Sequence, residues 1–167
     1  MSSAQETLDL ITFETFSHAF PRSNEICYDV MRFDYPVQLS EIRIIPSSMV
    51  MNTSSGEVPG STNPTKFSVQ FYINNINNES ATTFENLGTF EYDANANIQY
   101  KCNSRIWSDR LIVSGSYTTI SIATFGSLCV DPAVAAGNRT TAGYDFDSNI
   151  TSYMSQLKLS SNTKNNV

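Results

Sequence analysis

The chain has 167 residues, 40% of them hydrophobic, with ten basic and sixteen acidic residues and a formal net charge of -6. This length predicts a single domain with a buried core and room for a tail. Because the basic residues are spread along the chain without a cluster, strong direct RNA binding is not expected. No stretch approaches the roughly 20 apolar residues that a membrane-spanning helix needs, so no membrane contact is predicted.

Residues 1–9 are polar and acidic, and they lack the basic start and the apolar stretch of a signal peptide. They are predicted to be disordered. The chain contains three cysteines, Cys27, Cys102 and Cys129, without a Cys-x-x-Cys pair. An odd number in this arrangement indicates neither a disulfide framework nor a zinc site, and it favours a reducing compartment.

From residue 10 onward the hydrophobic residues recur with a period of two, which predicts β-strands. The first predicted strand covers residues 10–16. Within it, Ile11 and Phe13 alternate with polar residues, so both are expected on one face of the strand.

Pro36 and Pro46 are expected to bracket a strand, because proline cannot donate a ladder hydrogen bond. This segment holds two apolar pairs in opposite phases: Val37 with Leu39, and Ile42 with Ile44. A regular strand cannot bury both pairs on one face, because its side chains alternate strictly. One extra residue would bring the two pairs into the same phase. We therefore predict a β-bulge or a bend near Ser40 and Glu41.

Residues 51–64 are rich in Asn, Ser, Gly and Pro, and are predicted to form a long surface loop. Four further strands are predicted from alternation or from a short apolar run, at residues 67–73, 98–102, 111–113 and 120–125. The continuous run at 111–113 is typical of a strand buried on both faces. Polar or glycine-containing turns separate these strands, at residues 74–80, 93–97 and 114–116, and the turn at 93–97 is interpreted as a hairpin connection. Seven or eight short strands at this spacing predict an all-β fold, an antiparallel jelly-roll-like β-sandwich over residues 10–130.

The pattern changes in residues 131–167. Residues 133–143 are small and polar and are predicted to be a linker. A short amphipathic helix follows, with Ser148 as its N-cap and apolar residues at i, i+3, i+4 and i+7: Ile150, Tyr153, Met154 and Leu157. Two interpretations stay open, because the helix can pack on its own sandwich or can bind a partner. Residues 160–167 are predicted to be disordered.

The sequence shows no catalytic constellation. Its single histidine, His18, lies between aromatic residues and is interpreted as a hydrogen-bonded structural residue. Gly-x-Ser-x-Gly, P-loop and Gly-x-Gly-x-x-Gly motifs are absent, and nothing singles out a carboxylate pair for glycoside hydrolysis. Adenine methyltransferases carry an acidic-Pro-Pro-aromatic motif, and the nearest string here, at residues 130–133, lacks the second proline and the aromatic. We therefore predict a chain that is not an enzyme and that needs no cofactor, while a calcium ion on a loop stays a weak alternative.

Trp107 differs from the other aromatic residues because it lies among polar and charged neighbours, where it could serve as an exposed anchor for a partner. Core packing is the competing interpretation. We predict that the loops at 51–66 and 103–109 face a protein partner. The candidate contacts are Asn63, Lys66, Trp107 and Tyr117, with Tyr153, Met154 and Leu157 if the helix binds outside its own domain.

Five segments in a fixed order resemble the N-terminal domain of the virilizer family. They are Thr-Phe-Ser-His at 15–18, the segment at 36–46, Thr-Asn-Pro-Thr-Lys-Phe at 62–67, the segment at 83–92, and Gly-Ser-Tyr-Thr-Thr-Ile at 115–120. The resemblance spans roughly residues 10–126. It implies a galactose-binding-like jelly roll without a cofactor of its own.

The resemblance also implies a role. The family supplies non-catalytic scaffold subunits to the nuclear complex that methylates adenosine in messenger RNA, with links to RNA processing and splicing. The expected partners are therefore protein subunits of that complex, and the expected location is the nucleus. Virilizer proteins are very long and continue into helical repeats, so this chain is either a fragment or a short relative. The alternative function is a β-sandwich that binds a carbohydrate or another small ligand.

Overall fold

The computed structural model describes residues 9–18, 25–77 and 84–129, which form nine β-strands. All strand pairs are antiparallel, and the described residues contain no helix. The predicted all-β antiparallel sandwich is thus confirmed. The strands are β1 (Asp9–Ser17), β2 (Cys27–Ile44), β3 (Val50–Thr53), β4 (Gly56–Pro59), β5 (Lys66–Asn74), β6 (Phe84–Asp93), β7 (Gln99–Lys101), β8 (Ser108–Gly115) and β9 (Thr119–Leu128).

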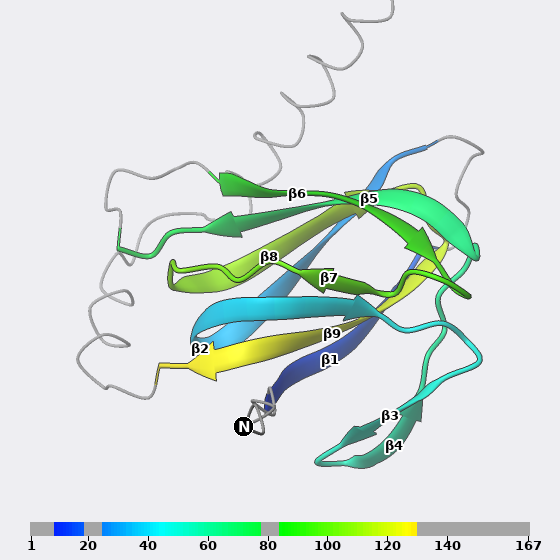
Figure 1. Cartoon of the computed structure of the whole chain (residues 1–167), viewed down its shortest axis with the longest axis horizontal. Helices are drawn as coiled ribbons and strands as arrows, with labels where there is room; N and C mark the ends of the chain where they lie inside the picture. The colour runs from blue at the N-terminus through cyan, green and yellow to red at the C-terminus, as the bar shows by residue number, and fades with distance from the viewer. Residues whose placement is uncertain (1–8, 19–24, 78–83, 130–167) are drawn as a thin grey trace, which may run out of the picture.

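The long strand β2 is shared by both layers of the sandwich (Figure 1). Its first part, residues 27–32, pairs with β8, so one layer runs β6-β5-β8-β2. Its second part, residues 37–44, pairs with β9 on one side and β7 on the other, which gives the layer β1-β9-β2-β7. Pro36 was expected to begin the strand, but it lies inside β2 at the bend between the two parts. A proline fits there because it cannot donate a ladder hydrogen bond.

The predicted bulge is confirmed at Ser40. Leu39 pairs with Gly126 and Glu41 pairs with Phe125, so Ser40 is the extra residue on β2. The bulge changes the phase of the strand, and residues on both sides of it reach the same core. The four apolar residues that conflicted in phase are all buried there: Val37, Leu39, Ile42 and Ile44.

The main core lies between the two layers. Its aromatic residues contact one another in two groups, with ring centroids 4.9 Å apart for Phe67 and Tyr92 in one group and 5.4 Å apart for Phe71 and Tyr100 in the other. The prediction that residues 111–113 are buried on both faces is confirmed. Leu111 and Val113 belong to the main core, whereas Ile112 packs with Tyr72 and Phe84 on the other face of the layer.

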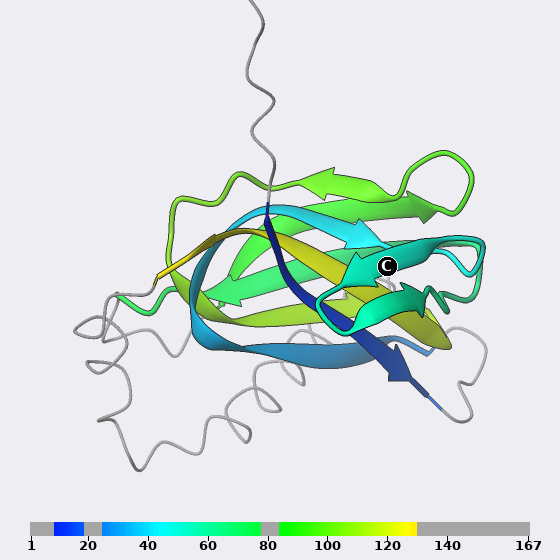
Figure 2. The ribbon, with the colours of Figure 1, turned by 90° about the horizontal axis from the view of Figure 1, so that it is seen from below.

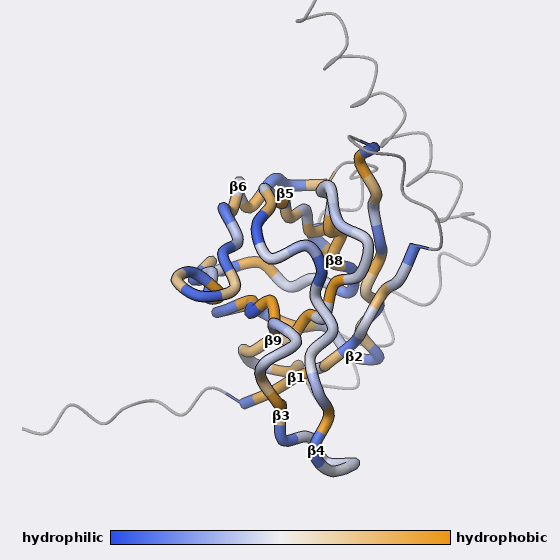
Figure 3. Tube along the Cα trace, turned by 90° about the vertical axis from the view of Figure 1, so that its right-hand side faces the viewer, coloured by the Kyte–Doolittle hydropathy of each residue, from blue (hydrophilic) through white to orange (hydrophobic). Residues whose placement is uncertain are grey.

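The sequence-based prediction of a loop at residues 51–64 is wrong in its first half. β3 and β4 pair there as a hairpin, which lies on the side of the molecule that carries β1 and β9 (Figures 1 and 3). The hairpin packs through Met51 onto a small outer cluster on the outer face of β9 and β1: Ile45, Ala123, Phe125, Leu10 and Phe13. Each of these strands has only four residues, which is too short for an alternation of apolar and polar residues to be recognised in the sequence.

Two further expectations need correction. Ile11 and Phe13 do not share a face, because the pairing of β1 with β9 shifts between Leu10 and Thr12. Ile11 packs against the main core and Phe13 against the small outer cluster. The turn at residues 93–97 forms as predicted, with hydrogen bonds between Asp93 and Asn97, but it does not join a hairpin. β6 and β7 belong to different layers, so this turn crosses the sandwich (Figure 2).

Candidate protein-interaction site

The two predicted partner-binding loops lie at opposite ends of the sandwich. Lys66 begins β5, whereas Trp107 precedes β8, which starts beside the far end of β5 because Ile73 pairs with Leu111. Nine residues of strand span about 25–30 Å. Figure 1 shows β5 ending, and β8 beginning, at the end where β2 bends. Loops 51–66 and 103–109 therefore do not form the single surface that the sequence suggested.

The end that carries Trp107 also gathers two exposed apolar residues. Val37 pairs with Ser108 on one side and with Leu128 on the other, so the segments holding Trp107 and Leu128 flank the bend of β2. Adjacent strands lie about 4.8 Å apart, which places these segments within roughly 10 Å of each other. Tyr35, at the bend, is 50% exposed and Leu128 is 47% exposed. We call Tyr35, Trp107 and Leu128 the bend-end patch.

Trp107 itself is half-buried, so it is less exposed than an isolated surface anchor. Its carbonyl oxygen accepts a hydrogen bond from the Ile76 amide at 3.0 Å. The sequence identified this residue through its polar context. It gave no signal for Tyr35 or Leu128, because their proximity to Trp107 depends on strand pairing.

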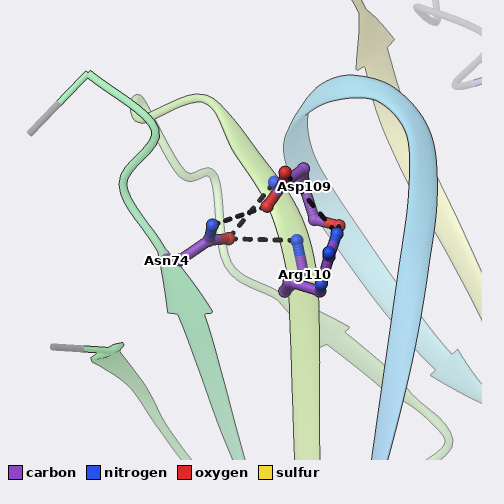
Figure 4. A network of polar contacts seen from close by, with 3 residues as sticks. All are labelled: Asn74, Asp109 and Arg110. Carbon is purple, nitrogen blue, oxygen red and sulfur yellow. Dashed lines mark hydrogen bonds and ion pairs between the residues drawn. The ribbon is translucent and has the colours of Figure 1, made fainter. Parts of the chain in front are cut away.

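A polar network holds the chain in place next to Trp107 (Figure 4). The side-chain amide of Asn74 donates to a carboxylate oxygen of Asp109 at 2.6 Å. The amide oxygen of Asn74 accepts from the backbone N–H groups of Asp109 (3.2 Å) and Arg110 (3.0 Å). Because Asn74 ends β5 and Asp109 lies at the start of β8, these bonds fix the position from which Trp107 is presented.

The opposite end of the sandwich carries Asn63 and Lys66. The Asn63 side chain is exposed, while its backbone N–H donates to the Thr119 carbonyl and its carbonyl accepts from the Thr118 N–H, each at 2.9 Å. The Lys66 side chain is 72% exposed, and its ammonium lies 3.4 Å from a carboxylate oxygen of Asp93. A surface ion pair of this kind contributes little stability, so the ammonium remains available to a partner. The partner-binding roles of both residues stay predictions.

Tyr117, which the sequence suggested as a partner contact, is instead a core residue that is 2% exposed. Its hydroxyl donates to a carboxylate oxygen of Asp29 at 2.7 Å, and its ring lies 5.6 Å from that of Phe67. The preceding turn leaves little room at Gly115, where a Cβ would lie 2.7 Å from the Ser68 carbonyl oxygen and 3.4 Å from the Tyr117 ring. The Gly-Ser-Tyr segment thus marks a closely packed turn rather than an exposed anchor.

His18 bonds to the same carboxylate, with 2.8 Å between its Nε2 atom and Asp29 Oδ2. This contact confirms the interpretation of His18 as a hydrogen-bonded residue. Burial raises the pKa of Tyr117 strongly, and the negative charge of Asp29 raises that pKa further. A phenol so placed stays neutral and donates a hydrogen bond to the carboxylate.

We expect stability to fall above pH 10, and Tyr117→Phe to make that fall shallower. A phenol with a raised folded-state pKa stabilises the fold fully below its unfolded pKa of about 10, and the benefit decreases as pH rises further. Removing Tyr117 should reduce the slope by about 1.4 kcal/mol per pH unit. Some slope should remain, because burial also raises the pKa of Tyr92 and Tyr100. Urea unfolding between pH 8 and 11 measures the effect.

The exposed Tyr35→Phe is the matched control for this experiment, since it removes a phenol from the surface. It should leave the slope unchanged. Equal slopes for the wild-type chain and Tyr117→Phe would show that the Tyr117–Asp29 contact does not couple folding to pH.

Arg43 and Glu41 form a further structural ion pair. Arg43 Nε lies 2.5 Å from a carboxylate oxygen of the buried Glu41, and the guanidinium stacks on Phe125 at 4.3 Å from the ring centroid. Within residues 9–18, 25–77 and 84–129, no three His, Cys, Asp or Glu residues are grouped to hold a metal ion. The same ranges include no helix of the length and apolarity that crossing a membrane requires.

The predicted contacts Tyr153, Met154 and Leu157 lie outside the described residues.

Comparison with known proteins gives consistent matches. The family model described as Virilizer, N-terminal, matches residues 6–139. Protein virilizer of Drosophila melanogaster is 34% identical over 129 residues, and protein virilizer homolog of Homo sapiens is 32% identical over 129 residues. Each alignment covers 75% of this chain, which spans only 7% of the length of either relative. Among solved structures, the C-terminal domain of a chitobiase from Bacteroides fragilis aligns with a TM-score of 0.42 and 15% identity, over 76% of this chain and 98% of that domain.

Proposed function

The chain belongs to the virilizer family, whose N-terminal domain matches residues 6–139, and from this we propose that it is a protein-interaction module of the messenger-RNA adenosine methylation complex. The family assignment confirms the resemblance on which the sequence-based expectation depended. In this proposal the domain is non-catalytic and acts as a scaffold in the nucleus. Its partners are protein subunits of the complex, through which it is linked to RNA processing and splicing.

We place the proposed binding surface at the bend-end patch. Binding energy at protein interfaces concentrates in a few aromatic residues, and Trp and Tyr are enriched among them. Tyr35 and Trp107 supply two such residues near the exposed Leu128. The Asn74 network fixes the chain beside Trp107, so less conformational entropy is lost on binding than for a mobile loop.

We expect Trp107→Ala to reduce capture of methylation-complex subunits by tenfold or more, because removing a central anchor costs about 2 kcal/mol or more. The measurement is affinity capture by the tagged 167-residue chain from nuclease-treated nuclear extract, with quantitative mass spectrometry. Circular dichroism and urea unfolding of the variant show whether the domain remains folded.

Lys66→Glu tests the opposite end of the sandwich in the same assay. The sequence predicted that it also weakens capture, but a single partner footprint on the bend-end patch leaves Lys66 outside. Loss of capture with Lys66→Glu and not with Trp107→Ala would move the interface to the opposite end. Full capture by both folded variants would remove both surfaces from the proposal.

A further inference from the structure

β1 is an edge strand whose pairing partners in the described residues all lie on β9. Its pairing is regular from Thr12 to Ser17, after the shift near Leu10. An unpaired strand edge presents a row of backbone N–H and C=O groups that another extended chain can bind. Natural sheets commonly protect such edges with lysine, proline or a covering segment. β1 contains neither lysine nor proline, and its ionisable residues are Asp9 and Glu14.

The β3–β4 hairpin lies beside this edge without closing it. A groove of about 610 Å³ separates β1 from the hairpin, and its lining residues are 10–15 of β1 with 52–55 and 58 of the hairpin. Apolar side chains of Leu10, Phe13 and Val58 contribute to the lining, together with hydroxyl and amide groups. The groove is therefore partly apolar, and it runs along residues 10–15 of β1, which include both the shift near Leu10 and the first residues of the regular pairing.

The two faces of β1 differ in chemistry. Phe13 packs on the small outer cluster, toward the hairpin. Thr12 and Phe16 face the main core, with the Thr12 hydroxyl 3.1 Å from the sulfur of Met31, and Glu14 alternates in phase with them. A strand added beside β1 would therefore place alternate residues next to Phe13 and next to Glu14.

The charge around Glu14 favours a basic neighbour. Glu14 is exposed, but partial desolvation raises its pKa, and the negative charge of Asp29 on β2 raises that pKa further. His18 and Tyr117 both contact Asp29, and the groove lining contains no lysine or arginine. A cationic side chain opposite Glu14 would offset this unfavourable environment.

We propose that the free edge of β1 binds an extended segment of a partner protein as an additional strand, with apolar residues toward the hairpin and basic residues toward Glu14. A second copy of this chain is a poor occupant. Its β1 would bring the same two acidic residues, and each chain carries a net charge of -6. This surface is separate from the bend-end patch and adds to the proposed function.

The test uses two synthetic peptides that alternate valine with a charged residue, acetyl-(Val-Lys)4-amide and acetyl-(Val-Glu)4-amide. We expect the lysine peptide to bind the 167-residue chain and to slow amide hydrogen exchange in Asp9–Ser17. The glutamate peptide should bind at least tenfold more weakly. Glu14→Lys should reverse this preference and reduce affinity for the lysine peptide at least tenfold.

Glu85→Lys is the matched control, because Glu85 is an exposed acid on β6, the strand at the edge of the other layer. It should change affinity less than twofold, as should Trp107→Ala, which tests the bend-end patch independently. Absence of binding at millimolar peptide would overturn the proposal. So would protection of β6 instead of β1, equal effects of Glu14→Lys and Glu85→Lys, or light-scattering evidence that β1 pairs with β1 of a second copy.

Discussion

Replacing Gly126 with alanine is expected to destabilise the domain by about 3 kcal/mol or more, because the added methyl group has no space next to the neighbouring backbone. A Cβ at this position would lie 2.0 Å from the carbonyl oxygen of Gln38 and 3.1 Å from the amide nitrogen of Ser40. Both atoms belong to the main chain of β2, so no side-chain rotation relieves the contact. β9 and β2 would have to separate where they pair across the bulge.

Urea unfolding of the 167-residue chain measures this effect, and a loss of that size should lower the midpoint by about 1–3 M. Ser127→Ala is the control, since it changes an exposed residue one position along the same strand. An alanine variant at Gly126 that unfolds within 0.3 kcal/mol of the wild-type chain would mean that β2 and β9 approach less closely than this structure shows.

Deleting Ser40 should have the larger effect, and we expect the variant to be unfolded or insoluble. Without the extra residue, the apolar pairs on the two sides of the bulge cannot face the core together. One pair, either Val37 with Leu39 or Ile42 with Ile44, would point away from the core. Burial of a large aliphatic side chain contributes about 1.5–3 kcal/mol, so losing two removes much of the 5–15 kcal/mol that stabilises a typical domain.

Far-ultraviolet circular dichroism and the two-dimensional amide spectrum of the deletion variant provide the measurement. Deletion of Ser55 is the matched control, because it also removes one serine, from the exposed turn between β3 and β4. That change should leave the spectrum of the main core near that of the wild-type chain. Suppose instead that the Ser40 deletion variant shows the amide chemical-shift dispersion and the urea midpoint of the wild-type chain. This result would show that β2 folds with either set of its side chains facing the core.

The sequence predicted the fold class because most strands bury one face or both. Period-two alternation located β5, the run at 111–113 located β8, and the change of phase between Leu39 and Ile42 located the bulge before any pairing was known. The first part of β2 was missed although Met31 and Phe33 alternate with Arg32 there. Pro36 was interpreted as a strand boundary, whereas a bent strand accommodates it between two sets of partners.

The candidate site was less predictable, because it depends on contacts between distant segments. Trp107 could be chosen from its polar neighbours alone. Tyr117 could not be judged in this way, since its environment is set by Phe67 and Asp29, which lie about 50 and 88 positions earlier in the chain. Likewise, the segments that hold Tyr35, Leu128 and Trp107 come together only because Val37, two positions after Tyr35, pairs with both Leu128 and Ser108.

The pairing of the first strand with the last has a consequence for synthesis of the protein. β1 pairs with β9, and the hydroxyls of Thr12 and Thr124 lie 3.0 Å apart although 112 positions separate them. The second half of β2 also requires β9. Until Thr119–Leu128 has left the ribosome, a nascent chain therefore carries β1 without its partner strand and the second half of β2 with β7 as a partner on one side only. Contacts between such distant segments form slowly. Any truncation before Thr119 removes an interior strand of that layer and leaves unpaired backbone groups on β1 and on one side of β2, to which other chains can bind.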